Sequence, residues 1–80
     1  MPHVIIKLYP GRSEEQKNAL AASVGKDIVA TLGCPERVVS VAIEEVAPED
    51  WPDTVYKPEI LDRPEQIYVK PGYNPFDKAK

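Results

Sequence analysis

Apolar residues fall at every second position in two short segments of the chain, "HVIIKLY" at 3–9 and "VVSVAIEEV" at 38–46. In the first segment one face is fully apolar and the other is mixed. In the second, Val39, Val41 and Ile43 share a face, while Ser40 lies on the other. Alternation with a period of two, in runs rich in β-branched residues, is typical of half-buried strands. The pattern predicts β-strands at 3–9 and 38–46.

The segment between them has a period close to four residues. Its apolar stripe consists of Leu20, Val24, Ile28 and Leu32, with Ala21 and Gly25 beside it. Ser13 and Gln16 have the spacing of a capping box, and Gly33 suits the position just after a helix. The pattern therefore predicts a helix from about 13 to 32.

The order strand, helix, strand predicts a β-α-β unit with parallel strands and a right-handed crossover, an α/β (α+β) fold. A two-stranded sheet is marginal by itself, and both of its edges are free to pair with another chain. We therefore expect a homo-oligomer in which dimerisation completes a four-stranded sheet.

Prolines become frequent after residue 47, at Pro48, Pro52, Pro58, Pro64, Pro71 and Pro75. Because proline interrupts helices, we expect only short helical turns at about 49–56 and 64–69, followed by an irregular tail at 70–80. The segment is nevertheless too rich in aromatic residues for a disordered tail, so it is expected to pack on a neighbour. The sequence predicts a single domain, 1–80, with a core at 2–46 and a proline-rich arm at 47–80.

Composition narrows the possible functions. The 80 residues carry a net charge of −3 with no basic stripe, which argues against nucleic acid as a partner. One cysteine, Cys34, and one histidine, His3, allow neither a disulfide within the chain nor a zinc site of four such ligands, so no metal is expected. No apolar run is long enough to span a membrane, and the start does not resemble a signal peptide, so a cytoplasmic protein is expected.

Pro2 precedes the first predicted strand. A proline is tolerated there because its missing N–H removes no ladder hydrogen bond. A second interpretation is chemical, because removal of Met1 turns the ring nitrogen of Pro2 into a free secondary amine. An α-amino group titrates at about 8 in short peptides, which suits a general base near neutral pH.

Several motifs together resemble the tautomerase superfamily, specifically the 4-oxalocrotonate tautomerase family. They are Met-Pro at the start, "GRSEEQK" at 11–17, the Gly-x-Pro connector at 33–35, and Trp51 shortly after the second strand. "APEDW" at 47–51 and "VKPGY" at 69–73 look most like the dimeric phenylpyruvate-type branch. The resemblance implies a dimer, or a hexamer built from three dimers. It also implies a cofactor-independent keto–enol tautomerase of small 2-oxo or 2-hydroxy acids, such as aryl enolpyruvates.

The resemblance also implies roles for individual residues. Pro2 would act in turn as general base and general acid, Arg12 would bind the substrate carboxylate or enolate, and Trp51 would exclude water. Hexameric relatives carry a second arginine where this chain has Ser40. Ser40 itself and Arg37 are the candidates to bind substrate in its place, and the missing arginine favours monoacid substrates.

Other interpretations stay open at this level. The same scaffold supports hydratase- or dehalogenase-like activity on unsaturated acids, for which Tyr56 or Glu44 would have to be recruited. It also supports a non-enzymatic oligomeric binding module. We interpret His3 as structural and Cys34 as an inert thiol.

Overall fold

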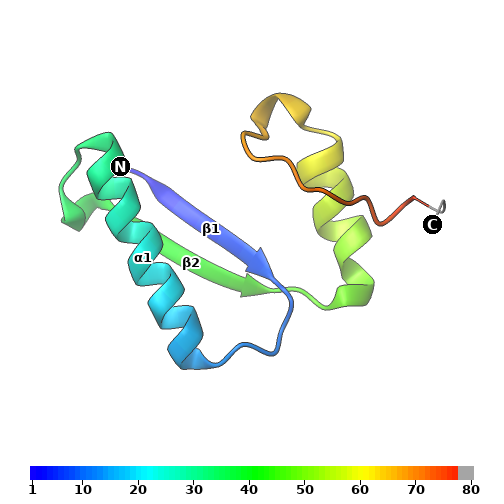
Figure 1. The fold of residues 1–80 in the computed structure, drawn as a ribbon, viewed down its shortest axis with the longest axis horizontal. Helices are drawn as coiled ribbons and strands as arrows, with labels where there is room; N and C mark the ends of the chain where they lie inside the picture. Colours follow the sequence, from blue (N-terminus) through cyan, green and yellow to red (C-terminus); the bar gives the residue numbers. More distant parts are fainter. Residues whose placement is uncertain (78–80) are drawn as a thin grey trace. The chain divides into compact units, whose positions relative to one another are not determined.

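A computed structural model describes residues 1–77 of the chain. The chain divides into two compact units, Met1–Glu45 and a second that starts at Val46. The first contains strand β1 (His3–Leu8), helix α1 (Glu14–Leu32), the 3₁₀ turn η1 (Glu36–Val38) and strand β2 (Ser40–Glu45). β1 and β2 are parallel and pair from His3↔Ser40 to Leu8↔Glu45. The predicted parallel β-α-β unit is therefore confirmed (Figure 1).

Both strands are shorter than predicted. Tyr9 lies beyond the end of β1, and Val38 belongs to η1 and not to β2. Alternation of apolar residues continues past both strands, whereas the pairing register covers His3–Leu8 and Ser40–Glu45. Prediction of element ends from periodicity alone is imprecise for this reason.

The predicted helix is confirmed, and its ends follow from local hydrogen bonds. The hydroxyl of Ser13 accepts a hydrogen bond from the backbone N–H of Gln16 at 3.0 Å, and the Gln16 side chain accepts one from the Ser13 N–H at 3.1 Å. Gly33 has a φ of 71° and donates its N–H to the Val29 carbonyl at 2.9 Å. That left-handed conformation costs glycine little, because it has no Cβ.

Only the middle of the apolar stripe packs against the sheet. Val24 and Ile28 are partly shielded, whereas Leu20 remains 39% exposed and Leu32 62% exposed. The apolar stripe is therefore longer than the part of it that is shielded. Two strands about 5 Å apart form a surface narrower than a helix about 10 Å across, so the ends of an inclined stripe extend beyond it.

The second unit contains a longer helix than predicted. Between two short 3₁₀ turns, η2 (Pro48–Asp50) and η4 (Pro64–Gln66), the helix η3 extends over ten residues, Pro52–Leu61, with Pro58 inside it. The expectation of a short turn at 49–56 was wrong. η3 is wound as a π-helix, and just after it the Asp62 N–H donates to the Lys57 carbonyl five residues back, at 2.9 Å.

Burial explains why this helix forms despite its proline. Val55 and Tyr56, each 5% exposed, are the buried hydrophobic residues among residues 1–77. Packing contributes more to helix stability in proteins than intrinsic propensity does. The two buried side chains therefore compensate for the backbone hydrogen bond that Pro58 cannot donate.

The tail that follows η4 has no regular structure but packs on η3. The Tyr56 hydroxyl donates to the Tyr73 carbonyl at 2.6 Å, and the Tyr56 ring meets Tyr73 and Phe76 edge to face, with centroids 5.3 Å and 6.3 Å apart. Trp51 Nε1 donates to the Tyr73 hydroxyl at 3.0 Å. Packing of this arm on a neighbouring chain stays a prediction, and the end of the predicted tail, 78–80, lies outside the described residues.

Candidate active site

Pro2 lies at the start of the sheet and is held there by its own backbone. Its carbonyl accepts a hydrogen bond from the Ser40 N–H at 3.2 Å, which continues the parallel ladder by one residue. The Pro2 ring is partly shielded, whereas Met1 is 96% exposed. Because Met1 contributes little packing, its removal would leave Pro2 in place and free the ring nitrogen.

Ser40 is bonded to the Pro2 backbone, and its side chain contacts His3. His3 and Ser40 are directly opposite in the parallel register, and His3 Nδ1 lies 2.6 Å from Ser40 Oγ. Sequence reasoning identified Ser40 but interpreted His3 as structural only. The available signal was that each residue begins, or nearly begins, one of two strands predicted to be parallel.

Arg12 lies in the loop that follows β1. The loop borders a hollow of about 440 Å³ lined by Leu8, Tyr9, Pro10, Gly11, Arg12 and Gln16. Gly11 has a φ of 122°, a conformation that L side chains rarely adopt, so the turn before Arg12 depends on glycine. Arg12 is exposed, and no ion pair joins it to another residue of the described chain. Its charge is therefore available to a ligand.

β1 separates Arg12 from Pro2. Pro2 precedes the strand and Arg12 follows it, and a six-residue strand is about 20 Å long at about 3.3 Å per residue. Within one chain these two predicted site residues are not brought together around one small molecule.

Arg37 is at the same end of the sheet as Pro2. It lies in η1, three residues before Ser40, and its side chain is exposed. Trp51 belongs to the second unit, where it is partly shielded and bonded to Tyr73.

Two residues considered for hydratase-like chemistry already have partners. Glu44 Oε1 lies 3.9 Å from Lys7 Nζ, and the Tyr56 hydroxyl donates to Tyr73. In the described part of the chain, no group of three or more His, Cys, Asp or Glu side chains is placed to hold a metal ion. Within the same range, no helix has both the length and the apolar character to cross a membrane.

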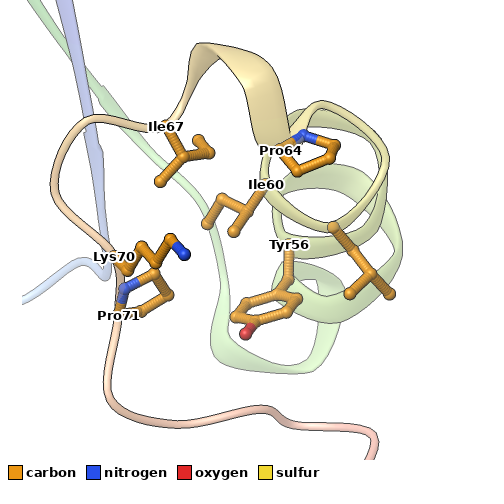
Figure 2. Close-up of a pocket in the computed structure, with 7 residues that line it drawn as sticks. Tyr56, Ile60, Pro64, Ile67, Lys70 and Pro71 are labelled. Carbon is orange, nitrogen blue, oxygen red and sulfur yellow. The ribbon is translucent and has the colours of Figure 1, made fainter.

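The second unit also contains a pocket of about 210 Å³. Among the described residues its lining consists of Tyr56, Ile60, Leu61, Pro64, Ile67, Lys70 and Pro71, of which Lys70 alone is charged. Figure 2 shows Lys70 and Pro71 of the tail across the pocket from Tyr56 and Ile60 of η3. Sequence reasoning did not predict this pocket, because it forms only when the tail packs back on the helix.

Comparison with known proteins identifies the class to which this β-α-β unit belongs. The model of the family described as tautomerase enzymes matches residues 2–52, which includes Pro2, Arg12 and Trp51. A probable tautomerase of Xylella fastidiosa (strain 9a5c) is 40% identical over 73 residues, which cover 91% of this chain and 89% of that protein. Tautomerase PptA of Enterobacter sp. (strain 638) is 40% identical over 75 residues, covering 92% of this chain and 99% of that protein.

Solved structures agree with this assignment. TomN, described as a 4-oxalocrotonate tautomerase homologue in tomaymycin biosynthesis, is 36% identical with a TM-score of 0.61, over 62% of this chain and 77% of that one. A heterohexameric 4-oxalocrotonate tautomerase of Chloroflexus aurantiacus J-10-fl is 33% identical with a TM-score of 0.63, over 68% and 87% of the two chains. The chain belongs to the tautomerase superfamily, in the 4-oxalocrotonate tautomerase family.

Proposed function

We propose that this protein is a cofactor-independent keto–enol tautomerase of small 2-oxo and 2-hydroxy acids, with the free amine of Pro2 as its general base and acid. The observation that carries the proposal is the position of Pro2, which is bonded through its carbonyl to Ser40 while Met1 is almost fully exposed. A base held by the sheet keeps a fixed geometry for proton transfer, which raises the rate of an intramolecular step. The tautomerase names of the relatives support the same reaction class.

The reaction moves one proton between oxygen and carbon. Pro2, unprotonated, takes the hydroxyl proton of an enol, and the resulting ammonium returns a proton to the neighbouring carbon. Negative charge develops on the substrate oxygen between the two steps, and a cation beside it stabilises that charge. Arg12 and Arg37 are the proposed cations for the carboxylate and the oxygen, and Trp51 is the proposed shield from water.

The proposed site needs more than one chain. Since the length of β1, about 20 Å, separates Pro2 from Arg12 of the same chain, the Arg12 that serves Pro2 comes from a second copy, whereas Arg37 lies at the Pro2 end of its own chain. We propose a homodimer whose two β-α-β units form a four-stranded sheet; a hexamer of three such dimers would meet the same requirement. The heterohexameric relative shows that assembly of several chains occurs in this family.

The first experiment uses protein prepared without an N-terminal tag, with intact mass measured to establish that Met1 is absent. Ketonisation of phenylenolpyruvate is then followed by ultraviolet absorbance. Pro2→Ala is expected to lower kcat by about 10²- to 10⁴-fold. A matched sample that retains Met1 should be equally slow, because its proline nitrogen is an amide. Unchanged turnover in both samples would contradict Pro2 as the base, whereas wild-type protein that does not exceed the uncatalysed rate would favour a binding module on the same fold.

Mixing of two inactive variants tests whether the site is shared. Pro2→Ala and Arg12→Ala dimers are unfolded and refolded together, and half of the resulting dimers should be mixed. Each mixed dimer has one intact site, so about a quarter of the wild-type turnover should return. If the mixture stays as slow as its components while it contains mixed dimers, Pro2 and Arg12 do not serve one site from two chains.

A further inference from the structure

The face of the sheet opposite α1 presents three side-chain pairs. The register places His3 beside Ser40, Ile5 beside Ala42 and Lys7 beside Glu44. α1 lies along the other face (Figure 1). There Ala21 of the helix and Val41 and Ile43 of β2 line one hollow. His3 and Ser40 are both exposed, so no element of their own unit covers them.

The contact between His3 and Ser40 determines what the serine offers to a ligand. Nδ1 and Oγ are 2.6 Å apart, which is short for a hydrogen bond between nitrogen and oxygen. When Nδ1 carries the hydrogen, it donates to Oγ and leaves the hydroxyl hydrogen available for another acceptor. When Nδ1 has no hydrogen, the hydroxyl donates to it, and Oγ offers only lone pairs. The tautomer of His3 thus decides whether Ser40 is a donor.

One peptide bond and one backbone hydrogen bond connect this pair to Pro2, the proposed base. His3 follows Pro2 directly in the chain, and the Ser40 N–H donates to the Pro2 carbonyl at 3.2 Å. Backbone and side-chain hydrogen bonds of Ser40 therefore join all three residues into one corner of the sheet. An oxygen bound by the Ser40 hydroxyl would lie beside the residue that moves the proton.

We propose that Ser40 donates a hydrogen bond to the substrate oxygen on which negative charge develops, and that His3 is the positioning residue that holds the hydroxyl in its donating orientation. The proposal deepens the proposed function and rests on it. A 2-oxo acid offers oxygen acceptors at this point, so it stabilises the tautomer of His3 in which Nδ1 donates.

Ser40→Ala and Ser40→Thr form the first matched comparison. Loss of one donor to a developing oxyanion lowers kcat by about 10²- to 10³-fold, so the alanine variant should be slow while KM changes little. Threonine retains the hydroxyl and suits a strand, so it should recover most of the turnover. Because Ser40 is exposed, neither substitution should disturb the fold, and circular dichroism of both variants checks this.

His3→Phe and His3→Asn test the positioning role. Phenylalanine removes the ring nitrogen, whereas the asparagine amide can place a donor near the position of Nδ1. We expect turnover to fall about tenfold or more in His3→Phe and to recover in His3→Asn. In the double variant with Ser40→Ala, His3→Phe should cause no further loss, because its effect passes through the hydroxyl.

Ser23→Ala, on the exposed side of α1 and away from this sheet face, is the control and should retain wild-type turnover. Equal turnover of Ser40→Ala and wild type would overturn the proposal, as would additive losses in the double variant. The turnover of Pro2→Ala distinguishes failure of this proposal from failure of the proposed function. If Pro2→Ala is slow and Ser40→Ala is not, the base is correct and the pair is wrong; the reverse result contradicts the base and retains the pair.

Discussion

The two units of this chain differ in where their order comes from. Met1–Glu45 contains both strands and the one long α-helix of the described chain, yet none of its residues is buried. The unit that starts at Val46 is rich in proline and has no strand in its described part, yet it contains the buried pair Val55 and Tyr56. Regular hydrogen bonding and burial are therefore separate sources of order here.

The difference indicates which unit depends on another chain. Hydrophobic burial is the dominant favourable contribution to folding, and the first unit leaves large apolar side chains exposed, including Ile5 at 50%. Ile5 lies on the sheet face that α1 leaves uncovered. We therefore expect the first unit to gain most of its stability on association.

We expect association to cover the sheet face around Ile5 as well as to pair the sheet edges. A charge at Ile5 should therefore have the largest effect, because a carboxylate is costly to bury in an interface. Ile5→Glu is expected to abolish the oligomer, measured by light scattering of the eluted protein, and with it the turnover that the oligomer supports. Ser23→Glu adds the same charge on the exposed side of α1 and should leave the mass unchanged. An Ile5→Glu protein with the wild-type mass would show that this face is not part of the interface.

Truncation of the buried tyrosine should have the next largest effect, and it is expected in the second unit. Tyr56→Ala removes two edge-to-face contacts and a hydrogen bond, and should cost about 3–5 kcal/mol of stability. Tyr56→Phe removes only the hydroxyl and should cost about 1 kcal/mol. Hydrogen exchange of the amides in 52–61 should accelerate in both, far more in the alanine variant. Equal acceleration would mean that the hydroxyl, and not the ring, holds the tail.

Loss of the N-terminal cap of α1, in the first unit, should reduce folding stability less than Tyr56→Ala does. Ser13→Ala removes the acceptor for the Gln16 N–H and should cost about 1 kcal/mol, measured as the free energy of unfolding in urea. Ser13→Asp preserves an acceptor and adds a favourable charge at the helix N-terminus, so it should be no less stable than wild type. A destabilised aspartate variant would contradict this account of the cap.

The smallest effect on stability is expected at Lys17, which connects α1 to β2 through an ion pair with Glu45. Hydrogen bonds with Glu14 and then Glu45, at 2.9 Å and 3.0 Å, raise the pKa of Lys17 above its ordinary value of 10.5. A raised pKa in the folded state adds stability that is fully present below the ordinary value and is lost as pH rises through the raised one. The Tm difference between wild type and Lys17→Met should therefore be constant around neutral pH and shrink in strong alkali. A difference that persists there would come from packing and not from charge.

The parts of the fold that sequence reasoning predicted are those determined by neighbouring residues. α1 follows from its apolar period and from the cap between Ser13 and Gln16, which are three residues apart. η3 could not be predicted in the same way. Its proline argues locally against a helix, whereas the Tyr56–Tyr73 hydrogen bond that accompanies its burial spans 17 residues.

The candidate site shows the same limit. Motifs were enough to select Pro2, Arg12, Ser40 and Trp51 as candidates, whereas Arg37 was selected only because it lies three residues before Ser40. Whether these residues act together stays a prediction. Alternation places His3 on a mixed face, and the strand register puts it beside Ser40, where its role stays a proposal. The separation of Pro2 from Arg12 follows from the strand between them once that strand is known to be extended and unbroken.

That strand has a kinetic consequence. An enzyme whose every site joins Pro2 of one chain to Arg12 of another is active only as an assembly, so its rate depends on its own concentration. When the protein is diluted below the dissociation constant of the assembly, activity per chain should fall. For a dimer, the total rate should then become proportional to the square of the protein concentration. A modest change in expression level near that point would then alter flux more than proportionally, without any separate regulatory ligand.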